Sequence, residues 1–303
     1  MTPILAIEDL RKVFITRSRT VHALSGVSIS LDPGETLGII GESGSGKSTL
    51  GRIAVGLDEP TSGQLSVGGE RIDGLSPQLR RQKLRRCQMI FQDPYSSLNP
   101  RLTVGRQIGE GLYASGQSDW REIRTTVADL LERVGLKRDF AERYPHEFSG
   151  GQRQRIAIAR AVAPDPQIVV ADEPVSALDV SIQAQILDLM AEIRRERRLS
   201  YLFISHDMAV VARLCDRIAV MHRGRIVESG PVRSIIDTPQ HPYTRNLLDA
   251  VPRFGRRRTG GKPAPVRLPE HRDDDVYVTV GDGHIVLEPG SAAMLDLPVG
   301  NLP

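Results

Sequence analysis

The sequence of 303 residues contains little cysteine and no long apolar run. Its two cysteines, Cys87 and Cys215, stand far apart, so they form no C-x-x-C metal-binding pattern and fit a reduced cytosolic setting. No apolar run approaches the roughly 20 residues that a membrane-spanning helix needs. We therefore expect any role at a membrane to depend on a partner protein.

Other features that would indicate a different class of protein are also missing. The first twelve residues, MTPILAIEDLRK, lack the basic-then-apolar order of a signal peptide. The sequence has no internal repeat, and its net charge of +3 is too small to indicate nucleic acid or an acidic lipid surface. Hydrophobic residues (40%) and charged residues (25%) occur at levels ordinary for a globular protein.

The strongest motif that is present is a phosphate-binding loop. Its residues follow the pattern G-x-x-x-x-G-K-[ST] and are Gly41-Glu42-Ser43-Gly44-Ser45-Gly46-Lys47-Ser48-Thr49. A short apolar run, Thr36 to Ile40, precedes the loop as a buried strand would, and Leu50 to Leu57 follow with helical spacing. The glycines allow successive N–H groups to turn inward at a helix N-terminus, which makes an anion-binding nest. We expect Lys47 to reach the phosphates and Ser48 to ligate Mg²⁺.

A pair of acidic residues closes a second buried strand. Ile168 to Ala171 is continuously apolar and runs into Asp172 and Glu173. A carboxylate at such a strand end, beside a phosphate loop, is the Walker-B arrangement. Asp172 would hold Mg²⁺, directly or through water, and Glu173 would orient and polarise the attacking water.

The segment Ser149-Gly150-Gly151-Gln152 starts another helix. Serine followed by two glycines offers backbone donors at a helix N-terminus, so this is a second phosphate-seeking helix start in one chain. Taken alone, the segment fits an ordinary helix cap equally well.

The remaining patterns predict an α/β fold. Strand patterns alternate with helix patterns, which favours a mostly parallel sheet covered on both faces. Antiparallel strands are expected on either side of the phosphate loop. A helical insertion is expected from about 100 to 147, and a late hairpin is expected around Arg223-Gly224.

A basic helix, Ser76 to Arg86, is either a solvated face or a nucleic-acid patch, and charge runs favour the first. The segment from 256 to 269 looks like a linker, and Val276 to Leu287 has one strand-like pattern.

Taken together, six motifs in register resemble the ATP-binding-cassette (ABC) ATPase family. They are Gly41–Thr49, Gln92, Ser149-Gly150-Gly151-Gln152, Asp172-Glu173, Ser176-Ala177-Leu178-Asp179 and His206. The resemblance covers about residues 4 to 230 and implies ATP and Mg²⁺ as ligands. It also implies a head-to-tail dimer, in which each ATP lies between the phosphate loop of one subunit and the Ser-Gly-Gly-Gln of the other.

The resemblance also assigns roles to single residues. Ser149, Gly150, Gly151 and Gln152 would contact the nucleotide in trans, and Asp179 would cross the dimer interface. Gln92 would sense Mg²⁺ and the attacking water. His206 would contact the γ-phosphate. Phe14 is our candidate for the aromatic residue that stacks on adenine, although it fits a core position equally well.

Two stretches resemble the oligopeptide/dipeptide and nickel branch of importer ATPases. The first is Phe91–Arg101, which includes Gln92. The second is Thr238–Thr244, which contains His241-Pro242-Tyr243. We thus expect a nucleotide-binding domain over 1–235, with a helical subdomain at about 100–160, and an extension over 236–303 that is partly linker. Many relatives carry a cysteine cluster in this extension; because no cysteine follows Cys215, we predict no iron–sulfur cluster.

The family implies a peripheral ATPase subunit on the cytoplasmic face of the membrane. Its expected partners are two permease subunits, a second ATPase subunit and, indirectly, an extracytoplasmic binding protein, but no nucleic acid. The second ATPase subunit would be a related chain or an identical one, and the family favours the first. The expected solute is an oligopeptide or dipeptide, with nickel, opines or sugars as alternatives. A soluble cassette protein acting on DNA or ribosomes is the rival class; such proteins usually carry two cassettes or a long coiled-coil insertion, and this sequence has neither.

Overall fold

The computed structural model describes residues 2–16, 19–249, 275–281 and 283–288. The expected linker at 256–269 lies outside the described residues. Among the helices that are described, none is long and apolar enough to cross a membrane.

The centre of the fold is an eight-stranded sheet with the order β11-β12-β10-β9-β3-β8-β7-β6. Strands β9, β3, β8, β7 and β6 run parallel, and β10, β12 and β11 extend the sheet in antiparallel fashion. In chain order, the strand bounds are β3 Thr36–Ile40, β6 Cys87–Ile90, β7 Ile168–Asp172, β8 Ser200–Ser205, β9 Arg217–His222, β10 Arg225–Pro231, β11 Val276–Gly281 and β12 His284–Glu288.

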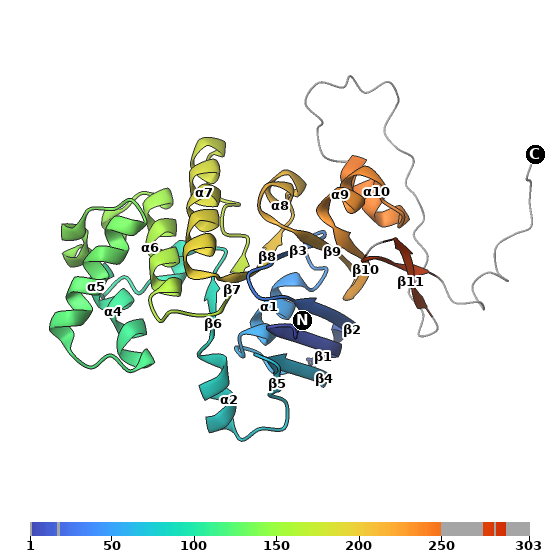
Figure 1. Cartoon of the computed structure of the whole chain (residues 1–303), viewed down its shortest axis with the longest axis horizontal. Coiled ribbons are helices and arrows are strands. Elements are labelled where there is room, and N and C mark those ends of the chain that lie inside the picture. The colour runs from blue at the N-terminus through green and yellow to red at the C-terminus, as the bar shows by residue number, and fades with distance from the viewer. Residues whose placement is uncertain (1, 17–18, 250–274, 282, 289–303) are drawn as a thin grey trace, which may run out of the picture.

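The N-terminal part of the chain forms a smaller antiparallel sheet of order β2-β1-β4-β5, next to α1 (Figure 1). Its strands are β1 Leu5–Ile15, β2 Thr20–Leu31, β4 Ser62–Val67 and β5 Glu70–Arg71. The expected strands on either side of the phosphate loop are therefore present.

Helices cover the central sheet and form a separate group at one end of the molecule (Figure 1). The helices in chain order are α1 Lys47–Ala54, α2 Pro77–Leu84, α3 Pro94–Ser97, α4 Val104–Ser115, α5 Trp120–Arg133, α6 Gly150–Val162, α7 Val180–Arg197, α8 Met208–Leu214, α9 Val232–Asp237 and α10 Pro242–Asp249. Two 3₁₀ turns, Arg138–Glu142 and Pro145–Glu147, connect α5 to α6. The group α4–α6 contains the predicted helical insertion.

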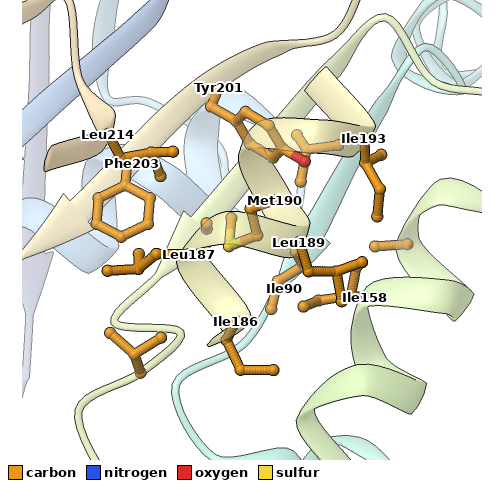
Figure 2. Close-up of a cluster of buried hydrophobic side chains, with 14 of the residues drawn as sticks. Ile90, Ile158, Ile186, Leu187, Leu189, Met190, Ile193, Tyr201, Phe203 and Leu214 are labelled. Atoms are coloured by element: carbon orange, nitrogen blue, oxygen red, sulfur yellow. The ribbon is translucent and has the colours of Figure 1, made fainter. Parts of the chain in front are cut away.

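The core has two layers because the parallel strands are buried on both faces. Along β8, Tyr201 and Phe203 belong to one apolar cluster, and Leu202 and Ile204 belong to the other. Figure 2 shows part of the first cluster, which contains Ile186, Met190 and Ile193 of α7 together with Tyr201 and Phe203. The second cluster joins the opposite face of the sheet to α1 and to β1, β2 and β4.

The basic helix α2 contains no buried residue. Arg80 pairs with Glu59 at 2.9 Å, and Lys83 pairs with Glu70 at 2.5 Å. Such exposed pairs contribute little to stability, and they fit the interpretation of this helix as a solvated face.

The structure near the C-terminus differs from the single strand that the sequence predicts over Val276 to Leu287. The described residues form two strands, β11 and β12, which pair in antiparallel fashion. Gly283, in the turn between them, has a φ of 67°, which glycine adopts without strain. Strand β12 then pairs with β10 and joins the hairpin to the central sheet.

Candidate functional site

The candidate site lies where four parallel strands end. The phosphate loop follows β3, Gln92 follows β6, Glu173 follows β7, and His206 follows β8. Since the carboxyl ends of parallel strands share one edge of a sheet, residues that are far apart in sequence meet there.

The shape of the phosphate loop depends on glycine. Gly46 is the N-cap of α1 and has a φ of 108°, in the left-handed region that disfavours other residues. A Cβ atom on Gly46 would lie 2.5 Å from the carbonyl oxygen of Ala23, and one on Gly41 would lie 2.1 Å from that of Met221. Larger residues at these two positions would therefore displace the loop.

Lys47 lies inside the loop and is 5% exposed. Its ammonium group donates hydrogen bonds to the carbonyl oxygens of Gly41 (2.7 Å) and Glu42 (2.8 Å). Burial lowers the pKa of Lys47, while the charges of Glu173 and Asp172 act in the opposite direction. The loop thus holds a buried cation among oxygen acceptors, beside two carboxylates.

Ser48 and Asp172 form the part of the site suited to a hard cation. The Ser48 hydroxyl donates to Asp172 Oδ1 at 3.1 Å. Burial raises the pKa of Asp172, and the hydrogen bond from Ser48 partly opposes that shift. Oxygen donors of this kind are the ligands that Mg²⁺ prefers, and a buried carboxylate gains from a nearby cation, so these residues fit the metal that the motifs predict.

Glu173 joins two of the other predicted residues. Gln92 Nε2 donates to Glu173 Oε2 at 2.9 Å, and His206 Nδ1 lies 3.1 Å from the same oxygen. The backbone of Glu173 has a φ of 46°, an uncommon value for a residue with a side chain, and its N–H donates to Ile204 O at 2.9 Å. The structure thus brings Gln92, Glu173 and His206 together around one carboxylate oxygen.

The segment Ser149–Gln152 starts α6 with a capping box. Ser149 Oγ accepts from Gln152 N–H at 3.4 Å, and Gln152 Oε1 accepts from Ser149 N–H at 3.0 Å. The helix begins at Gly150 rather than near Gln152. Among the described residues, no hydrogen bond or ion pair joins this segment to the phosphate loop of its own chain.

Asp179 lies at the exposed start of α7. Its side chain makes no capping hydrogen bond, and the neighbouring Val180 is 82% exposed. Leu178, in the same segment, lies near Gly150, and Ile182 lies near Gly151. An exposed valine and an uncapped acidic side chain beside Ser149–Gln152 form a surface that is suited to a partner.

Phe14 lies near the end of β1 and is 39% exposed. The Lys12 ammonium lies 4.8 Å from the centroid of its ring. The side chain is therefore not in the core, although Lys12 lies over its ring, and its role in adenine binding stays a prediction.

Two contacts to the phosphate loop were not predicted. Gly224 N–H, in the turn between β9 and β10, donates to Ser45 O at 2.9 Å. Glu42 N–H donates to the hydroxyl of Tyr243 at 3.0 Å. The segment around Tyr243 stood out in the sequence, but no local pattern signals a contact between residues that are 201 positions apart.

Two family models match the chain. The model described as "ABC transporter" matches residues 24–176, and the one described as "Oligopeptide/dipeptide transporter, C-terminal region" matches residues 227–275. The chain therefore belongs to the ABC transporter family and is one of its ATP-binding cassettes. Its C-terminal part is of the oligopeptide/dipeptide transporter type, as the segment at 238–244 predicted.

Known relatives agree with this assignment. The chain is 49% identical over 308 residues to the glutathione import ATP-binding protein GsiA of Escherichia coli O6:H1, and 48% identical over 307 residues to that of strain K12. In both comparisons the match covers 95% of this chain and 49% of the relative, so the chain spans about half the length of the curated relatives it matches.

Solved structures confirm the predicted cassette fold. One is described as a dimeric post-hydrolysis state of the ATP-binding cassette MJ0796 bound to ADP and Pi; it is 29% identical, with a TM-score of 0.70, and the match covers 76% of this chain and 99% of that one. Another is cbiO1 of Clostridium perfringens, described as part of the ABC transporter complex cbiONQ; it is 30% identical, with a TM-score of 0.69, and the match covers 78% of this chain and 92% of that one.

Proposed function

We propose that this chain is the ATP-hydrolysing subunit of a multi-subunit importer of small peptides. It would act on the cytoplasmic face of the membrane, bound to two permease subunits and paired with a second cassette. The observation that carries the proposal is the meeting of Gln92, Glu173 and His206 beside the Lys47 loop and the Ser48–Asp172 pair. A site of this composition suits transfer of a phosphoryl group to water.

The residues of the site would have separate roles in ATP hydrolysis. The amides of the loop and Lys47 would bind the β- and γ-phosphates and stabilise the charge that develops on them. Glu173 would accept a hydrogen bond from the attacking water and align it, while Gln92 and His206 hold the carboxylate in place. Ser48, Asp172 and Gln92 would hold Mg²⁺, which when bound neutralises phosphate charge.

The second half of the ATP pocket would come from the partner cassette. Ser149–Gln152 form the capped N-terminus of α6, where Ser149 is exposed and the next three residues are half-buried, and Asp179 is exposed. A helix N-terminus attracts phosphate oxygens because of its unpaired N–H groups and its dipole. Paired head to tail with another cassette, these residues would meet the γ-phosphate held by the partner's loop.

The proposed solute class depends on the C-terminal region and on the relatives. The C-terminal match belongs to oligopeptide/dipeptide transporters, and the relatives are named for import of glutathione, itself a short peptide. The chain would supply energy, and the choice of solute would lie with other subunits. Nickel, opines and sugars are therefore the alternatives that an assay must include.

The test uses the assembled complex. Tagged chain is purified from detergent-solubilised membranes, and the co-purifying permeases are reconstituted into liposomes. ATP-dependent uptake of labelled glutathione and dipeptides is then compared with that of nickel, opines and sugars. The Lys47→Ala chain is the control. ATP-dependent uptake that Lys47→Ala abolishes supports the proposal; co-purification with nucleic acid or ribosomes, without permeases, would refute it.

A further inference from the structure

One peptide group in the phosphate loop is held from both sides. The carbonyl of Gly41 and the N–H of Glu42 belong to the same planar unit. Lys47 donates to the carbonyl at 2.7 Å, and the N–H donates to the hydroxyl of Tyr243 at 3.0 Å. Rotation of this peptide would therefore break both hydrogen bonds.

The tyrosine is a fixed, buried partner. Tyr243 is 2% exposed, and its ring lies 4.2 Å from that of His222, centroid to centroid, at the end of β9. Strand β9 pairs directly with β3, the strand that leads into the loop. Although Glu42 is exposed, the Tyr243 side chain is almost fully buried, so removal of its hydroxyl would take away the protein partner of the Glu42 N–H.

The position of Tyr243 depends in turn on the C-terminal extension. Tyr243 is the second residue of α10, whose start is held by the Glu228 carboxylate. Glu228 is fully buried and accepts from the N–H groups of Gln240 (2.8 Å) and His241 (3.1 Å). His284 of β12 places its Nε2 atom 2.7 Å from the same carboxylate. A continuous set of contacts thus runs from the β11–β12 hairpin through α10 to the phosphate loop.

We propose that Tyr243 is a positioning residue for ATP, acting through the Gly41–Glu42 peptide. This inference rests on the proposed function, since it takes the loop to be the ATP site. When Lys47 turns from the Gly41 carbonyl toward phosphate, that peptide loses one of its two hydrogen bonds. The bond to Tyr243 remains and keeps the loop in the conformation that binds, so less ordering is needed when ATP arrives.

The inference gives the extension a role in the nucleotide site of its own chain. Displacement of α10, by loss of its Glu228 anchor or by a partner that binds the hairpin, would remove the hydroxyl from the loop. The predicted result is weaker ATP binding with little change in the chemical step, because among the described residues no hydrogen bond or ring contact joins Tyr243 to Gln92, Glu173 or His206.

The test replaces Tyr243 by phenylalanine, which keeps the ring and removes the hydroxyl. The loss of one neutral hydrogen bond in this position should raise Kd and KM for ATP by about 2- to 10-fold, with kcat within about twofold. Thr244→Val is the matched control: Thr244 is the next residue of α10, is fully buried, and its hydroxyl has no hydrogen-bond partner among the described residues. The Thr244→Val variant should bind ATP with the Kd of the wild type.

The outcomes separate this inference from the proposed function. A higher Kd in Tyr243→Phe alone supports the inference. An unchanged Kd in Tyr243→Phe, or an equal rise in both variants, overturns it while wild-type ATP binding stands. A wild-type chain that binds no ATP refutes the proposed function itself.

A second measurement needs no variant. The Glu42 amide of the nucleotide-free wild-type chain should exchange with deuterium at least about 100-fold more slowly than in an unstructured peptide, since opening requires Tyr243 to move. Exchange at the unprotected rate would overturn the inference, even if Tyr243→Phe failed to fold.

Discussion

Replacement of Glu173 by glutamine tests the assignment of the residue that aligns water. The change keeps the volume of the side chain and removes one negative charge. Glu173 Oε2 accepts from Gln92 at 2.9 Å and faces His206 at 3.1 Å. In the Glu173→Gln variant the amide oxygen of the new side chain can take over the bond from Gln92. The local structure should therefore persist, at a cost of about 1 kcal/mol in the free energy of unfolding.

The catalytic effect should be far larger than the effect on stability. An amide is a much weaker proton acceptor than a carboxylate, and loss of a positioned general base costs about 10²- to 10⁴-fold in rate. This corresponds to about 3 to 5 kcal/mol in the activation barrier. ATP binding should be equal or tighter, because the neutral amide no longer repels the γ-phosphate.

The assay measures phosphate release at saturating Mg-ATP together with equilibrium binding of ATP. Glu110→Gln, an exposed glutamate on α4, is the matched control and should keep the wild-type rate. The Glu173→Gln variant should also accumulate as an ATP-bound dimer in size-exclusion chromatography. A kcat within tenfold of wild type would refute the role given to Glu173.

Three further substitutions test other parts of the site. Ser149 is exposed on its own chain. Ser149→Arg should therefore leave the Kd for ATP within about twofold of the wild-type value and reduce steady-state hydrolysis by at least about 100-fold. Normal turnover would contradict an ATP pocket shared by two cassettes. In the presence of a chelator, the Asp172→Asn variant should have a higher Tm than the wild type. Addition of Mg-ATP should no longer increase the Tm of this variant. The reason is that the folded pKa of Asp172 lies above its ordinary value, so its ionised form lowers stability at neutral pH, and this penalty disappears as pH falls through the folded pKa. An unchanged response to Mg-ATP would remove Asp172 from the metal site. Phe14→Ala should raise Kd for ATP by about 5- to 100-fold if its ring stacks on adenine, and an unchanged Kd would assign stacking to another residue.

Much of the fold could be predicted because its signals are local. The run Thr36–Ile40 before the glycines, and the apolar run that ends at Asp172, mark buried parallel strands by composition alone. The spacing of Val127, Leu130, Leu131 and Val134 marks one helix face, and the first three are buried in α5. The sequence predicts one strand in place of the β11–β12 hairpin, because exposed apolar side chains occur at consecutive and alternate positions of β11 (Val276, Tyr277 and Val280) and obscure the alternation of the pattern.

The arrangement of the site residues was harder to predict than their identity. A local pattern identified Glu173, and the family resemblance identified Gln92 and His206, but their meeting at one oxygen depends on the order β8-β7-β6 in the sheet. Tyr243 was missed as a neighbour of the phosphate loop for the same reason: its contact depends on the pairing of β3, β9 and β10 and on the buried Glu228 that holds α10. Tertiary contacts of this kind leave no periodic trace in the sequence.

The most direct test concerns the sharing of each ATP between two molecules. The ATPase rate per molecule of the purified chain is measured over a thousandfold range of protein concentration at saturating Mg-ATP. We predict that the rate per molecule falls steeply as the protein is diluted, because Ser149–Gln152 must come from a second cassette. A rate per molecule that stays constant on dilution, in a chain that remains monomeric with ATP bound, would contradict the account.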